Sequence, residues 1–366
     1  MRLLPIIALL LAAAAPAQAA RSVPRAFYGM NWDRELAFAP DEVQDAAFRR
    51  MATTGVETVR LSFRWSDAQP SEGAPFDHAR TDAVVARAVR RRSQVLPVVI
   101  HAPPWAREQA GVDFSPPKRA ADYAAYVKSL VERYGPGGTF WAENPGLRRA
   151  PIRAWQIWNE PHLPYQWSIP DDRWAPSYVR LLKAAHRAVN KVDRRALVVL
   201  AGLTNSSPMF LRELYEAGAR RHFDVAAIHP YTRKPKNTVR LAARFRKVMR
   251  RRGDGDKQLW ATEIGLPASQ GRAGSDSPLQ TTDKGMARWL RKTYALFAKA
   301  RRRPKVGVTR LYWYTWASDY RGEIFEFSGL HRFRPGGKPK ARPAWRAYRA
   351  SAREHQGCRK APSGRC

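Results

Sequence analysis

The sequence predicts a single α/β domain in which eight parallel strands close into a (β/α)8 TIM barrel. Eight short runs rich in β-branched and aromatic residues recur along the chain, as expected for strands. Helical stretches with apolar residues at three- and four-residue spacing separate these runs. Strict alternation of strand and helix requires parallel strands joined by helical crossovers, and eight such repeats close into a barrel.

The strand assignments follow the β-branched and aromatic runs in chain order: residues 27–31, 57–63, 95–101, 152–159, 197–202, 225–229, 258–263 and 309–316. The helices between and after them are expected over residues 41–53, 79–92, 118–134, 173–190, 208–217, 238–251, 282–301 and 343–353. An open doubly wound sheet is the alternative. It needs a glycine-rich phosphate-binding turn after the first strand, and the sequence GMNWD at residues 29–33 contains none.

The two ends of the chain differ from the barrel in composition. Residues 1–19 carry one early positive charge, an apolar run and an Ala-x-Ala site, which predict a signal peptide cut after Ala19 and a secreted, extracellular protein. A membrane anchor is the alternative, but the apolar run is shorter than the ~20 residues that a spanning helix needs. We expect no membrane span, the barrel over residues 22–354, and a tail over residues 355–366 in which Cys358 and Cys366 form a disulfide.

The charge balance is strongly basic, since 65 Lys and Arg residues against 31 Asp and Glu residues give a formal net charge of +34. Such a surface attracts polyanions, which makes an anionic glycan or a cell-wall polymer a candidate partner. The excess is mainly arginine, in runs such as residues 90–92 and 301–303, a pattern that is also typical of solvated outer faces. No nucleic-acid-binding motif is present, so no specific nucleic-acid partner is expected.

Two glutamates close predicted strands. The segment AWQIWNEP at residues 154–161 is apolar until Asn159 and Glu160, and the segment LWATEIG at residues 259–265 places Glu263 before a glycine. Glutamate is a poor strand residue, and burying its charge in a barrel mouth walled by tryptophan costs folding free energy, so its presence there indicates a functional role. The two lie three β-α units apart, so both are expected to project into one mouth. Rim salt bridges with the abundant arginines are the structural alternative.

This pattern resembles clan A of the retaining glycoside hydrolases, in which catalytic glutamates follow strands four and seven, and the resemblance covers residues 27–353. It implies that Glu160 is the acid/base, Glu263 the nucleophile and Asn159 a donor to the sugar 2-hydroxyl. The implied activity is hydrolysis of β-glycosidic bonds in oligo- or polysaccharides by double displacement, with carboxyl groups ~5–5.5 Å apart. A transglycosidase with the same residues and a non-catalytic glycan-binding protein of the cell envelope are the alternatives.

The other strand ends resemble family 5 of that clan. The resemblance implies that Arg60 and Tyr231 hydrogen-bond to Glu263, and that His229 faces the acid/base or the surroundings of the nucleophile. It also implies that His101 contacts sugar hydroxyls.

Aromatic residues at the barrel mouth are candidate sugar platforms, since a ring face suits the apolar face of a pyranose. Trp316 is expected to stack on the sugar at the cleaved bond, with Trp313 as the alternative if the strand register is shifted. Further stacking candidates are Trp32, Trp105 and Trp167. The turn HAPPW at residues 101–105 and the opening GMNW at residues 29–32 are similar to family 39 instead. Histidines and acids show no metal-ligand spacing in the sequence, so neither a metal nor another cofactor is expected.

Overall fold

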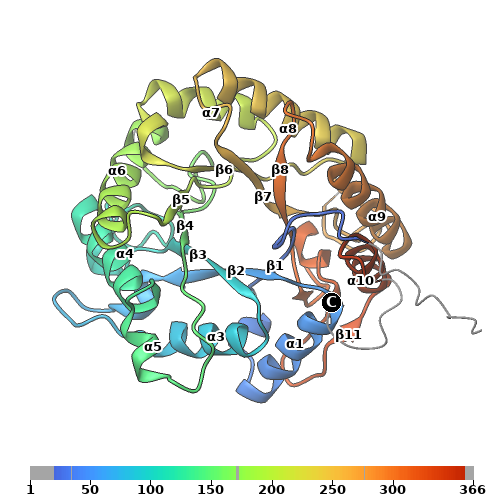
Figure 1. Cartoon of the computed structure of the whole chain (residues 1–366), viewed down its shortest axis with the longest axis horizontal. Coiled ribbons are helices and arrows are strands. Elements are labelled where there is room, and N and C mark those ends of the chain that lie inside the picture. The colour runs from blue at the N-terminus through green and yellow to red at the C-terminus, as the bar shows by residue number, and fades with distance from the viewer. Residues whose placement is uncertain (1–19, 34, 170–172, 276, 359–366) are drawn as a thin grey trace, which may run out of the picture.

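The computed structural model describes residues 20–33, 35–169, 173–275 and 277–358. Eight parallel strands close a barrel in sequence order (Figure 1), and β8 pairs with β1. The strands are β1 (Tyr28–Trp32), β2 (Thr58–Arg64), β3 (Gln94–Ile100), β4 (Ala154–Ile157), β5 (Leu197–Val199), β6 (Val225–Ile228), β7 (Gln258–Ile264) and β8 (Val308–Trp313). The predicted barrel is therefore confirmed. The predicted signal peptide and Cys366 lie outside the described residues, so export and the disulfide with the buried Cys358 stay predictions.

Helices surround the barrel (Figure 1). They are α1 (Asp41–Thr54), α2 (Trp65–Ala68), α3 (Ala79–Arg90), α4 (Ala120–Tyr134), α5 (Thr139–Glu143), α6 (Trp174–Val192), α7 (Ser207–Glu216), α8 (Pro235–Arg251), α9 (Asp283–Ala300) and α10 (Pro343–His355). The eight predicted helices are present with shifted ends, whereas the short α2 and α5 were not predicted because one turn carries no apolar period. Among the described residues, no helix is both long enough and apolar enough to cross a membrane.

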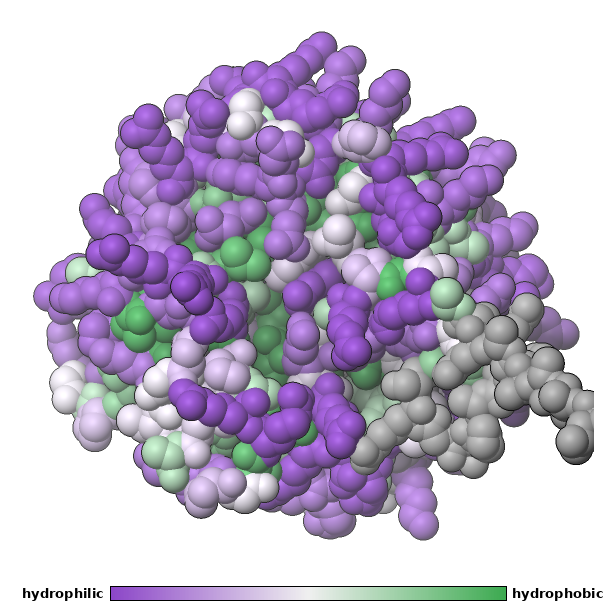
Figure 2. All heavy atoms as spheres, viewed as in Figure 1, coloured by the Kyte–Doolittle hydropathy of each residue, from purple (hydrophilic) through white to green (hydrophobic). Residues whose placement is uncertain are grey.

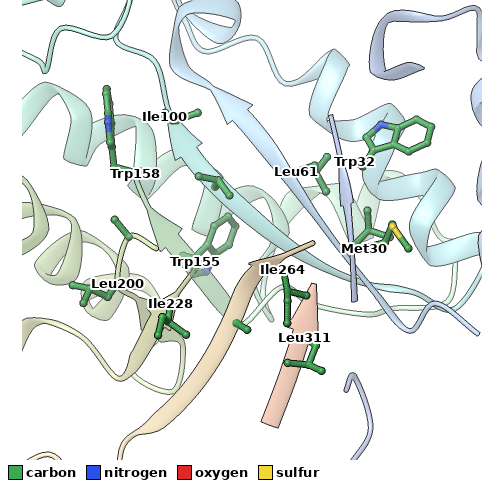
Figure 3. Close-up of a cluster of buried hydrophobic side chains, with 14 of the residues drawn as sticks. Met30, Trp32, Leu61, Ile100, Trp155, Trp158, Leu200, Ile228, Ile264 and Leu311 are labelled. Carbon is green, nitrogen blue, oxygen red and sulfur yellow. The ribbon is translucent and has the colours of Figure 1, made fainter. Parts of the chain in front are cut away.

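Two hydrophobic cores follow from the strand period of two, which sends alternate side chains to opposite faces. A small cluster fills the inside of the barrel and includes Leu96, Val225 and Tyr312. A much larger one lies between the strands and the helices, and Figure 3 shows some of its members on successive strands. Because one face of every strand is covered by helices and the other by the filled interior, the barrel is a packed body with its free space at the ends.

The chain between β8 and α10 forms a small three-stranded sheet that the sequence analysis missed. It consists of β9 (Ala317–Ser318), β10 (His331–Arg332) and β11 (Lys340–Ala341), with β10 parallel to β9 and antiparallel to β11. Strands of two residues are too short to show an alternating pattern. The outer surface is polar, and Figure 2 shows hydrophilic side chains over most of the face that Figure 1 presents.

Candidate active site

A cavity of about 500 Å³ opens at the carboxyl ends of the strands. Glu160, Glu263, Arg60, Asn159 and Tyr231 all line it. A neighbouring cavity of about 680 Å³ shares part of its wall, including His101. The sequence-predicted carboxylates therefore meet in one open space large enough for a sugar ring.

Glu263 reaches this cavity because β7 is irregular at its carboxyl end. Ala261 faces Leu311 of β8 and Ile264 faces Trp313, so three steps on β7 oppose two steps on β8. An extra residue of this kind is a β-bulge, which re-aims a side chain. Thr262 and Glu263 both bond to groups inside the barrel mouth, although adjacent residues of a regular strand point to opposite faces.

Two donors hold the carboxylate of Glu263. Nη1 of Arg60 donates to Oε1 at 2.9 Å, and the hydroxyl of Tyr231 donates to Oε2 at 2.7 Å. Burial by itself would raise the pKa of the Glu263 carboxyl, but His229, Arg60 and the Tyr231 hydroxyl outweigh burial and hold that pKa below its usual value. The carboxylate is therefore kept ionised and oriented.

Arg60 connects several strand ends at once. Its Nε donates to Gln156 Oε1 at 2.8 Å, its Nη1 also donates to Asn31 Oδ1 at 2.6 Å, and its Nη2 donates to Asn159 Oδ1 at 2.6 Å. A guanidinium has no acceptor, so the amide atoms that face it are oxygens. Asn159 consequently offers its N–H groups to a ligand. The sequence analysis missed Asn31 and Gln156, although a polar residue at an inward position of an apolar strand is a usable signal.

Glu160 follows β4 through a turn of unusual backbone. Trp158 and Glu160 have φ values of 63° and 46°, a left-handed conformation that is uncommon outside glycine and tends to cluster at functional sites. The indole N–H of Trp158 donates to the carbonyl of Gln166 at 2.8 Å and anchors the turn. Burial raises the pKa of the Glu160 carboxyl and the charge of Glu263 raises it further, against the lowering effect of His229. Glu160 therefore keeps its proton to a higher pH than a free carboxyl group does.

His229 lies between the two carboxylates and is fully buried. Its Nδ1 is 2.5 Å from Glu160 Oε1 and 3.6 Å from Glu263 Oε2, and its Nε2 is 2.9 Å from Thr262 Oγ1. A Cβ at Gly202 would lie 1.9 Å from Nε2 of His229. Glycine is therefore required after β5 to leave room for the imidazole ring. The resemblance left two placements for His229, and the structure places its hydrogen bond on Glu160.

The ligand atoms of Glu160, His229 and Glu263 lie within 4.8 Å of one another. The spacing of histidines and acids in the sequence gave no sign of this cluster. Positions far apart in sequence meet because parallel strands bring their carboxyl ends to one mouth. The guanidinium of Arg60 already occupies one side of Glu263, which opposes a second cation there. The arrangement suits a reaction in which one carboxylate attacks a molecule bound between the two groups and the other carboxyl group donates a proton to it.

No protein-family model matches the chain, and no curated protein matches it. Solved structures do. A family 39 glycoside hydrolase from Bacteroides cellulosilyticus WH2 superposes with a TM-score of 0.69 at 18% identity, over 92% of this chain and 64% of that one. This chain therefore shares the (β/α)8 barrel fold of that glycoside hydrolase.

Two further solved glycoside hydrolases are similar to this chain. A monomeric beta-xylosidase from Caulobacter crescentus CB15 has a TM-score of 0.62 at 16% identity, over 91% of this chain and 69% of that one. The endoglucanase Cel5A of Pseudomonas stutzeri has a TM-score of 0.58 at 16% identity, over 92% of this chain and 95% of that one. Identities this low establish a shared fold, and the chain spans less than two thirds of the family 39 protein.

His101, the residue that the clan A resemblance assigns to sugar hydroxyls, lines the cavity. It has a φ of 61°, and its ring packs 4.6 Å from that of Phe114. Burial and the charges of Arg64 and Arg107 lower the pKa of His101 to about 4. The imidazole is therefore neutral near pH 7 and has one donor and one acceptor to offer.

The expected tryptophan platforms do not reach the cavity. Trp313 is 0% exposed and donates to the carbonyl of Ser328, and Trp316 is 1% exposed and packs against His331. The physical reason is the alternation of β8, which turns Trp313 outward with Leu311. Tyr314 lines the cavity instead.

The remaining tryptophan candidates differ in position. Trp32 lines the cavity, whereas Trp105 and Trp167 are absent from its described lining. Trp167 packs edge-on against Trp158 with ring centroids 5.0 Å apart. The sequence analysis missed the aromatic lining residues Phe114, Tyr165, Tyr314 and Phe325, of which Tyr165 is 66% exposed. No pattern marked Tyr165, because it lies in a loop between regular elements.

Proposed function

We propose that this protein is a retaining glycoside hydrolase that cleaves β-glycosidic bonds in oligo- or polysaccharides. The observation that carries the proposal is the carboxyl pair, whose oxygens lie within 4.8 Å and whose pKa values move in opposite directions. Retaining enzymes have carboxyl groups ~5–5.5 Å apart, whereas inverting enzymes leave ~6.5–9.5 Å for a water molecule. The clan A neighbours, a xylosidase and an endoglucanase among them, support the same activity.

In the first step, an oxygen of Glu263 attacks the anomeric carbon and forms a glycosyl ester. The bond from that carbon to the leaving oxygen breaks, and the leaving oxygen takes the proton of Glu160. The donors on Glu263 keep it ionised before the attack, and the N–H groups of Asn159 are placed to hold a sugar hydroxyl. Glu263 loses its negative charge when the ester forms, and Glu160 gains a negative charge when it gives up its proton, so the net charge of the cavity does not change.

In the second step, Glu160 is a carboxylate and accepts a proton from water. The resulting hydroxide oxygen attacks the anomeric carbon and releases Glu263. Two inversions give net retention. If a sugar hydroxyl replaces water, the same residues perform transglycosylation.

Proton NMR of the first-formed product tests the proposal. We expect the β anomer to appear first from a β-glycan panel of glucans, xylans, mannans and acidic glycans, and we expect Glu263→Gln to abolish turnover. The appearance of the α anomer first would exclude double displacement. Glycan binding without turnover by the unaltered protein would favour a binding protein instead.

A second experiment assigns the acid/base. We expect Glu160→Ala to lose cleavage of unactivated glycans and to regain turnover of activated aryl glycosides when azide is added. Normal cleavage of unactivated glycans by this variant would show that Glu160 is misassigned. We also propose that the protein acts outside the cell, which the composition of residues 1–19 supports and which N-terminal sequencing of the exported protein would test.

A further inference from the structure

A second cavity, of about 310 Å³, lies at the end of the barrel opposite the catalytic carboxylates. Its wall includes Ala26, which precedes β1, Glu57, which precedes β2, and Gln94, the first residue of β3. Parallel strands begin at one end of a barrel and finish at the other. This cavity therefore has no wall in common with the catalytic one.

Five arginines line this cavity: Arg25, Arg91, Arg92, Arg349 and Arg353. Arg91 and Arg92 directly follow α3, Arg349 and Arg353 lie on α10, and Arg25 precedes β1, so they come from three separate parts of the chain. Small residues such as Gly55 and Ala52 leave the space between them open. We name this set of five residues the arginine pocket.

The wall of the arginine pocket carries five positive side chains and one carboxylate. The single lining carboxylate, Glu57, accepts a hydrogen bond from Arg21 at 2.9 Å, and Arg21 is not part of the lining. Within the described residues, Arg25, Arg91, Arg92 and Arg349 make no ion pair. Like charges gathered around one space repel one another unless an anion enters.

Other arginines of this chain behave differently. Arg87 pairs with Asp41 and Asp45, and Arg133 pairs with Asp82 and Glu143. In the arginine pocket, by contrast, the guanidinium groups of Arg25, Arg91, Arg92 and Arg349 share one cavity, and none of these four forms an ion pair among the described residues.

We propose that the arginine pocket binds a phosphate-bearing polyanion. Guanidinium groups match phosphate oxygens in pairs of parallel hydrogen bonds. A phosphate group also carries more negative charge in a small volume than a carboxylate, which suits several guanidinium groups around about 310 Å³. The site is separate from the carboxylate pair and does not depend on the proposed hydrolase activity. It gives a defined place to the polyanion attraction that the net charge of +34 predicts.

The test compares two variants of the full chain with equal loss of charge. The first is Arg91→Gln/Arg92→Gln/Arg349→Gln, in the arginine pocket. The matched control is Arg244→Gln/Lys247→Gln/Arg251→Gln on α8, which lies on another side of the barrel (Figure 1). Titration calorimetry measures binding of tripolyphosphate, inorganic phosphate and oligogalacturonate at low and at high salt. Thermal unfolding of each variant verifies folding, and the single variant Arg92→Gln, at an exposed side chain, serves if the triple variant unfolds.

We expect tripolyphosphate to bind the unaltered protein, and the pocket variant to lose about tenfold in affinity while the control keeps it. The salt dependence of binding should also become weaker in the pocket variant, because fewer charges take part. Equal losses in the two variants would assign the binding to diffuse surface charge and overturn the proposal. So would an unaltered protein that does not bind tripolyphosphate, or one that binds oligogalacturonate as tightly.

Discussion

Glu160 and Glu263 share one cavity, and burial raises the pKa of both carboxyl groups, yet their overall pKa shifts are opposite. Glu263 has a guanidinium and a phenol as donors, whereas Glu160 has one imidazole contact and the charge of Glu263 nearby. The number and charge of the donors therefore decide which carboxyl group stays ionised. This difference supports the two proposed roles without reference to any relative.

The rate of cleavage should have a bell-shaped dependence on pH. Activity needs ionised Glu263, so it is lost as the pH falls through the lowered pKa of Glu263. It also needs protonated Glu160, so it is lost as the pH rises through the raised pKa of Glu160. Tyr231→Phe removes a donor from Glu263 and should move only the acidic limb, to higher pH. Measured kcat/KM profiles check this, and a shift of the alkaline limb alone would contradict it.

Thr262 determines how His229 meets the acid/base. Among the described residues, the only partner of Thr262 Oγ1 is Nε2 of His229, and when the imidazole is neutral we expect the hydroxyl to donate to Nε2. The imidazole hydrogen is then on Nδ1 and faces Glu160 Oε1, which leaves Oε2 of Glu160 to carry the catalytic proton. For the neutral imidazole, we therefore expect the Nδ1–H tautomer of His229 and a catalytic proton on Oε2 of Glu160.

Thr262→Val should lower kcat/KM by about tenfold, the cost of one hydrogen bond in a buried network. Without the donor at Nε2, the hydrogen moves away from Nδ1, the contact that lowers the pKa of Glu160 is lost, and the alkaline limb moves to higher pH. Thr262→Ser keeps the hydroxyl and should keep the profile. Nitrogen NMR of His229 reports the tautomer directly, and an unchanged tautomer in the valine variant would refute this arrangement.

The sequence allowed prediction of the residues whose type is out of place in a strand. Glu160 and Glu263 are charged residues in apolar surroundings, so their position alone marks them. Trp313 and Trp316 were wrongly expected at the mouth because tryptophan suits both a core and a sugar platform, and one residue of register decides between them. Tyr165 gave no signal at all, because loops have no period.

At the scale of elements, the strands end where the backbone departs from regular geometry. β4 is shorter than the predicted residues 152–159 because Trp158 turns into the left-handed region. β7 contains a bulge before its end, and β5 stops at Val199, ahead of the glycine that makes room for His229. The hydrophobic pattern of the sequence locates the strands. The residue at which each strand ends depends on contacts with neighbouring strands, which this pattern does not reveal.

Gly202→Ala tests the end of β5. The added Cβ would meet His229, so we expect a loss of stability of about 1–3 kcal/mol from overpacking and a fall in kcat/KM of about tenfold or more. Gly146→Ala is the matched control, since no heavy atom lies within 4 Å of its Cβ position. Thermal unfolding and kinetics measure the two effects. If the two variants behave alike, close packing after β5 has no part in holding the imidazole.

At the scale of the whole molecule, the predicted barrel is confirmed because its evidence is spread over the full chain. Eight apolar runs and eight amphipathic helices each support the alternation of strand and helix. An error at one boundary therefore does not change the predicted closed order of strands. The small sheet after β8 had no such repetition and was missed.

Buried histidines should make the fold sensitive to acid. Burial lowers the pKa of His162 and of His331 to about 3, from an ordinary value of 6.5. Between these values the unfolded chain binds protons that the folded protein does not, so the free energy of unfolding should fall as the pH drops below about 6.5. His331→Gln should flatten this dependence. Thermal unfolding at a series of pH values measures it, and a constant melting temperature down to pH 4 would contradict the expectation.

Arg60 extends from β2 to acceptors on β1, β4 and β7. One side chain therefore braces the interior of the barrel and supplies the counter-charge of the proposed nucleophile. Any substitution of Arg60 would therefore remove hydrogen bonds that hold the strands together and, at the same time, a donor to the proposed nucleophile. An engineer who wishes to alter the reactivity of this cavity without loosening the protein must begin elsewhere.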